Sequence, residues 1–115
     1  PVQMRRYSDL NRYHLSTTAY LAEKLKGIPE ANGGTLLDNT LIMWGTNMGN
    51  SNQHQHYDVP HFLIGGKNLG MRGNRHLAYE RKTHTTGNLL LSILDMYGIN
   101  KEQQGDSTGR LPKLL

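Results

Sequence analysis

Two short apolar runs in the middle of the chain constrain its fold more than any other feature. One is "NTLIMWG", residues 39–45, and the other is "VPHFLIGG", residues 59–66. Turn-forming residues bound both runs, and Pro60 stands at the start of the second, where a strand loses no ladder hydrogen bond. A short continuous apolar run is typical of a strand that is buried on both faces. We therefore predict two buried strands.

An amphipathic helix is predicted on each side of these strands along the chain. The first covers residues 9–26 after a capping Ser8, and the second covers residues 84–97 between a cap in "THTT" and Gly98. Their helical stripes are Leu10, His14, Thr17, Leu21 and Leu25 in the first helix, and Leu90, Ile93, Leu94 and Tyr97 in the second. Helices and strands in this order favour an α/β unit with a mostly parallel sheet.

Composition limits what the chain can be. Its 115 residues, 36% of them hydrophobic and 19% charged, fit a single domain spanning residues 1–115. No apolar run approaches the roughly 18–20 residues of a membrane span, so none is expected. The net charge is +4, but the basic residues are scattered, and a nucleic-acid surface needs a continuous basic stripe, so no nucleic-acid partner is expected. Without cysteine, a metal would need imidazole, carboxylate or amide ligands.

The start of the sequence suggests a fragment. It opens at Pro1 with no initiator methionine and no signal-like segment. We expect a carboxy-terminal piece of a larger α/β domain, whose natural partner is the upstream remainder of the parent chain. Two isolated strands leave unpaired edges, and such edges pair readily with other chains. The fragment alone is therefore expected to associate with itself.

The polar loop between the strands carries the candidate chemistry. His54, His56 and Asp58 lie two residues apart, so in an extended segment their side chains point to the same side. Zinc accepts imidazole and carboxylate ligands together, and open α/β sheets bind ligands beyond the carboxyl ends of their strands. We predict a divalent-metal site, with zinc as the metal, on these three residues. The alternative is a polar connection with solvated histidines.

The remaining histidines have simpler explanations. His61 in the second run is expected to be a hydrogen-bonded face residue, and His14 a half-buried packing residue of the first helix. His76 and His84 could reach a site at the strand ends, and their roles stay open. Tyr57 is expected to anchor the loop. Neither a G-x-S-x-G elbow nor a phosphate-binding G-x-x-x-x-G-K-[ST] loop occurs, which gives no support to those nucleophile and nucleotide sites.

Five blocks in order resemble a known family. They are "GGTLLDNTLIMWGTNMGN", "HQHYDVPHFLIGG", "RGNRH", "TGNLLLSILDMYGI" and "GDSTGRL", which together cover most of the chain from about Leu10 onward. They resemble the carboxy-terminal part of a bacterial family of unknown function named for its HxxSHH motif, although that motif itself is absent. The resemblance extends to the alkaline phosphatase and sulfatase superfamily.

That resemblance implies a fold and a function. It implies a partial three-layer α/β/α, alkaline-phosphatase-like unit in a secreted or periplasmic protein that hydrolyses phosphate or sulfate esters with divalent metals. By position, His54, His56 and Asp58 match the histidine loop of such sites. Asn47 stands where an acidic ligand is expected, and a neutral amide binds divalent metals less well than a carboxylate.

The residues and the family resemblance together leave three functions open. The first is a contribution of metal ligands to a phosphatase-like or sulfatase-like site, with the fragment itself inactive. The second is a non-catalytic binding or structural module with a degenerate metal site. The third is a basic anion-binding domain that uses Arg72, Arg75, Arg81 and Lys82.

Overall fold

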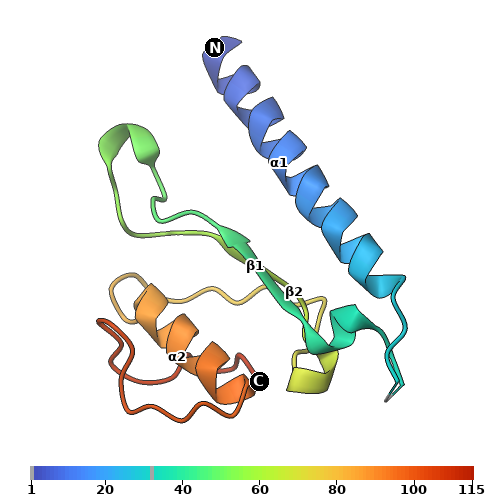
Figure 1. The fold of residues 1–115 in the computed structure, drawn as a ribbon. Coiled ribbons are helices and arrows are strands. Elements are labelled where there is room, and N and C mark those ends of the chain that lie inside the picture. Colours follow the sequence, from blue (N-terminus) through green and yellow to red (C-terminus); the bar gives the residue numbers. More distant parts are fainter. Residues whose placement is uncertain (1, 32) are drawn as a thin grey trace.

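A computed structural model describes residues 2–31 and 33–115 of the chain (Figure 1). Two helices and two strands follow one another as α1, β1, β2 and α2. Their bounds are α1 Val2–Lys26, β1 Leu41–Gly45, β2 His61–Gly65 and α2 Thr86–Met96, with short 3-10 helices at Leu36–Asn39, Ser51–Gln53 and Lys67–Leu69. Both predicted strands are present, although each is shorter than its apolar run. The prediction that they are buried on both faces is wrong, because no residue of either strand is fully buried and Phe62 is 46% exposed.

The sheet corrects the predicted fold class. β1 and β2 pair antiparallel, with Leu41 opposite Gly65 and Gly45 opposite His61. The predicted partial three-layer α/β/α unit with a mostly parallel sheet is therefore wrong, and the chain is a small α+β protein. The reason lies in the connection between the strands. A parallel pair needs a crossover, usually a helix, whereas residues 46–60 hold only the 3-10 helix Ser51–Gln53 and fold back as a long hairpin loop.

The strand register separates the residues of the hairpin into two faces. Trp44 and Phe62 are opposite one another, and their ring centroids lie 5.5 Å apart. The alternation of side chains along a strand places the neighbouring pair, Met43 and Leu63, on the other face with His61. In Figure 1 the hairpin lies between α1 and α2, so each face of the hairpin is turned toward a different helix.

Helix α1 is longer than predicted, and a different face of it is buried. It begins at Val2, so Ser8 lies inside it and does not cap it. Ala22 is its buried residue, while Leu10 and Leu21 of the predicted inner stripe are 52% and 47% exposed. His14 is exposed as well. The carboxy-terminal half contacts β1 and the 3-10 helix Leu36–Asn39, and the amino-terminal half extends away from the rest of the molecule (Figure 1).

The bounds of helix α2 confirm the prediction to within two residues at each end. The predicted stripe is not its buried face, because Leu90 and Tyr97 are 39% and 47% exposed whereas Leu89 and Leu91 are buried. Gly98 has φ of 73° and follows the helix, as predicted, and the Ile99 amide donates to the Leu94 carbonyl as in a Schellman ending. At the other end, the Asn88 side chain accepts hydrogen bonds from both the amide and the hydroxyl of Thr85. These bonds fix where the helix begins.

The last segment of the chain, residues 101–115, packs against α2 as an ordered tail. Leu114 of this tail is buried, as are Leu89 and Leu91 of the helix. The Arg75 guanidinium donates to the carbonyls of Lys113 and Leu114 at 2.8 and 2.6 Å. The main core of the described residues therefore lies around α2. Within residues 2–31 and 33–115, no helix has the length and apolar character that crossing a membrane requires.

Candidate functional site

A large cavity separates the hairpin from α2. Its volume is about 1610 Å³, and its walls come from β2, the start of α2 and the connecting segment, which we define as residues 71–85. Apolar side chains of both halves face it, including Leu63, Leu77 and Leu89. It exceeds the roughly 300–1,000 Å³ of ordinary small-molecule pockets. The hollow is wide and partly open to solvent.

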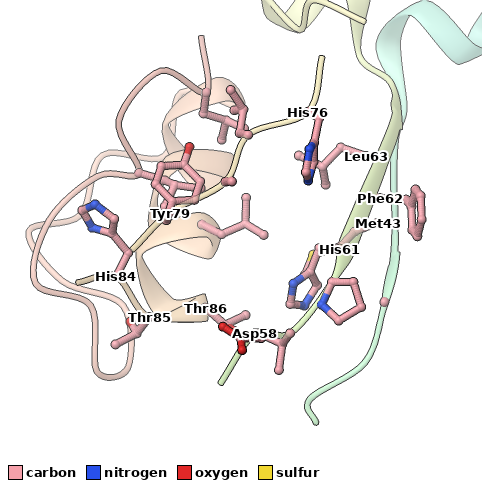
Figure 2. Close-up of a pocket in the computed structure, with 18 of the residues that line it drawn as sticks. Met43, Asp58, His61, Phe62, Leu63, His76, Tyr79, His84, Thr85 and Thr86 are labelled. Atoms are coloured by element: carbon pink, nitrogen blue, oxygen red, sulfur yellow. The ribbon is translucent and has the colours of Figure 1, made fainter. Parts of the chain in front are cut away.

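Imidazoles are concentrated along this cavity. Four of the six histidines line it, namely His56, His61, His76 and His84. Figure 2 shows His61 and His76 pointing toward the hollow from β2 and from the connecting segment. Residues far apart in the sequence thus reach one space, which the spacing of histidines along the chain does not predict.

His61 is the imidazole whose chemistry the fold changes most clearly. It is half-buried, and burial lowers its pKa below the usual 6.5, because the charged form loses hydration. A hydrogen bond with the backbone of Val59 opposes this shift in part. The ring is accordingly neutral near neutral pH, which is the form that binds metals.

This pKa predicts a dependence of stability on pH. Unfolded His61 takes up a proton near pH 6.5, whereas the folded ring stays neutral to lower pH, so its contribution to stability decreases as the pH falls through 6.5. His61→Gln removes this titration. We expect the free energy of unfolding of the wild type, measured with urea, to decrease more than that of the variant between about pH 7.5 and pH 5.5. Parallel decreases would contradict the prediction.

The three predicted metal ligands are only partly brought together. His56 and Asp58 line the cavity, whereas His54 ends the 3-10 helix Ser51–Gln53 at the far end of the loop. His54 and Asp58 have φ of 52° and 55°. The segment is therefore not extended, although the prediction from residue spacing required this. All three side chains are exposed. Within residues 2–31 and 33–115, no group of three histidine, aspartate or glutamate side chains is close enough to hold a metal ion.

Asp58 has another partner. Its two carboxylate oxygens accept hydrogen bonds from Nε and Nη2 of Arg81, the first at 3.0 Å. The Arg81 guanidinium also lies over the ring of Tyr57, 4.7 Å from its centroid. Hydrogen bonding to Asp58 raises the pKa of Arg81 further. From the sequence, Arg81 is expected only as an anion-binding residue, and no local pattern indicates this long-range pair.

Two of the four basic residues of the proposed anion-binding domain are held by other groups of the chain. Arg75 binds carbonyl groups of the tail, and Arg81 binds Asp58. Arg72 and Lys82 also line the cavity, but two cations on one segment do not form a continuous basic surface. The geometry gives the anion-binding domain little support.

His84 lines the cavity, but contacts with neighbouring side chains make it less available to bind a ligand. Its ring meets that of Tyr79 edge-on, with centroids 5.2 Å apart (Figure 2). Its Nδ1 atom is buried and has no hydrogen-bond partner among the residues that the structure describes. Tyr79 in turn donates to the Pro112 carbonyl at 2.6 Å. These contacts place His84 in the packing between the connecting segment and the tail.

Local backbone contacts give the loop of residues 46–60 its shape. The Asn50 side chain accepts hydrogen bonds from the amides of Asn52 and Gln53, at 3.1 and 3.3 Å. The amides of Gly49 and Gln55 reach across the loop to carbonyl groups at 3.0 Å. The Asn50 side chain thus acts as a local turn-forming group, whereas Asn47 is exposed on the cavity wall.

Comparison with known proteins identifies no relative. The chain matches no protein-family model, no curated protein and no solved structure.

Proposed function

We propose that this chain supplies imidazole ligands for a divalent metal, zinc, at a phosphatase-like or sulfatase-like hydrolase site of a secreted or periplasmic protein. The observation that carries the proposal is that His56, His61 and His76, from three separate segments, all line one cavity. The neutral state that burial gives His61 adds support, because a metal ligand must be unprotonated. Imidazole is also a preferred zinc ligand.

The donor types fit zinc, but the ligand shell is incomplete. No three candidate ligands of the described residues converge on one point, and His54 stands apart from the cavity. We propose that the upstream remainder of the parent chain supplies the other ligands. The chain by itself should therefore bind zinc weakly and show no esterase activity, and we derive no catalytic step from its residues.

Two observations favour a second function, a non-catalytic module with a degenerate metal site. Asp58 is held by Arg81, and Asn47 occupies the place where the family resemblance implies an acidic ligand. Both features reduce the negative charge that would balance a cation. In this alternative the histidines shape a binding surface without a metal.

Zinc-dependent thermal stability separates the two functions. At about tenfold excess of zinc over its dissociation constant, binding should add about 1.4 kcal/mol of stability. For a chain of this size, that raises the melting temperature by several degrees. Replacing His56 and His61 together with alanine should abolish the rise. His14→Ala, which removes an exposed histidine of α1 far from the cavity, should leave it unchanged.

Two results would contradict the metal proposal. Absence of a shift with about millimolar zinc favours the non-catalytic module. An equal shift in the wild type, the double variant and His14→Ala would show binding at scattered histidines. His76→Ala extends the test, because a site on the cavity wall loses affinity when this ring is removed, whereas a site confined to the loop does not.

A further inference from the structure

Asp58, one of the three predicted ligands, occupies a position that fits another role. Both of its carboxylate oxygens are engaged by Arg81, and the backbone of Asp58 itself is left-handed, with φ of 55°. Arg81 also covers the ring of Tyr57, the residue before Asp58. A bidentate pair with a stacked aromatic ring fixes the direction of the carboxylate. That direction is toward the connecting segment.

The pair joins the two sides of the cavity. On one side is the hairpin, and on the other are the connecting segment, α2 and the tail. Two side-chain hydrogen-bonded links among the described residues cross between them, and they lie at opposite ends of the strands. The Leu41 amide donates to the Tyr97 hydroxyl at 3.2 Å where β1 begins, and Arg81 binds Asp58 just before β2 begins.

We infer that Arg81 and Asp58 form a latch across the mouth of the cavity, and that Asp58 positions the loop of residues 46–60 instead of ligating metal. His56 lies two residues before Asp58, so the latch holds that imidazole at the cavity wall. Figure 2 shows Asp58 at the edge of the hollow, below His61. The statement about metal rests on the proposed function, but the latch itself does not.

The latch is weak enough to open. The side chains of Arg81 and Asp58 are 63% and 51% exposed, and exposed ion pairs add little stability. Loss of the pair should increase local opening about two- to fivefold. Asp58→Asn is a suitable change, because asparagine tolerates a left-handed backbone. Arg81→Gln removes the other charge and keeps a polar side chain.

Amide exchange measured by NMR tests the latch without metal. The Thr83 amide donates to the Glu80 carbonyl in the turn that carries Arg81. Its exchange should accelerate about two- to fivefold in Asp58→Asn and in Arg81→Gln, and no further in the double variant. The matched control is Asp95→Asn, which breaks the ion pair between Asp95 of α2 and Arg110 of the tail, at 2.7 Å. It should leave Thr83 unchanged. Unchanged exchange in both latch variants would overturn the latch.

Zinc titration, with affinity taken from the thermal shift, tests the role of Asp58. A positioning role predicts that Asp58→Asn and Arg81→Gln weaken zinc binding equally, by about two- to fivefold. If Asp58 is a ligand, Asp58→Asn weakens binding much more, and Arg81→Gln strengthens it by freeing the carboxylate. Opposite effects of the two variants would therefore overturn the inference. If the wild type binds no zinc, the proposed function fails, and the exchange of Thr83 still decides the latch.

Discussion

Leu91→Ala is expected to lower the free energy of unfolding by about 2–5 kcal/mol, the largest effect of any single truncation that we predict. Leu91 is fully buried in α2 and belongs to the small core that includes Leu89 and Leu114. Its removal leaves a cavity where the helix meets the tail. Stability of domains this small is on the order of 5–15 kcal/mol, so the loss is a large part of the total. Urea unfolding followed by circular dichroism measures it.

The neighbouring residue provides the control. Leu90 occupies the next position of α2 but is 39% exposed, so Leu90→Ala should cost less than about 1 kcal/mol. Both variants lose the same atoms from the same helix, and alanine favours a helix in both. A cost for Leu90→Ala equal to that for Leu91→Ala would show that α2 does not pack through the face described above.

Gly49→Ala is expected to disrupt the loop that carries the histidines, at a cost of about 1–3 kcal/mol. A Cβ atom at position 49 would lie 2.9 Å from the carbonyl oxygen of Asp58 and closer still to that of Tyr57. Both obstacles are backbone atoms, so no side chain can rotate away to make room. The two arms of the loop must separate, and His56 must then leave its place at the cavity.

Two measurements check this prediction. The Gln55 amide donates across the loop to the Asn50 carbonyl at 3.0 Å, and its exchange should accelerate in Gly49→Ala. Urea unfolding should show the lower stability. Gly73→Ala is the control, since a Cβ there meets no atom within 4 Å among the described residues. Should both substitutions have the same small effect, the close approach of the two arms would be contradicted.

The positions of the helices and strands could largely be read from the sequence because they depend on local chemistry. Apolar runs between turn residues located β1 and β2, and Gly98 marked the end of α2. The direction of pairing could not be read this way. Two short apolar runs pair in parallel or antiparallel with equal local preference, and the decision depends on whether residues 46–60 carry a crossover or fold back. The order of the predicted helices and strands favoured the wrong alternative, a mostly parallel sheet.

The inner face of α1 shows a similar limit. Its helical pattern was correct, but the stripe that includes Leu10 and Leu21 does not face the rest of the molecule. The apolar residues of this helix lie on several sides, so periodicity alone does not select one. Contacts of its carboxy-terminal half with β1 and the 3-10 helix Leu36–Asn39 make that selection.

The sequence by itself determined which chemical groups the loop of residues 46–60 offers, namely imidazoles, one carboxylate and no thiolate. Only the tertiary structure decided which of them meet. It places His56, His61 and His76 along the wall of one cavity, leaves His54 apart, and pairs Asp58 with Arg81. Local turns depend on short-range chemistry, whereas the grouping of side chains from different segments depends on how distant parts of the chain pack together. The spacing of residues along the chain therefore does not predict which side chains share a cavity.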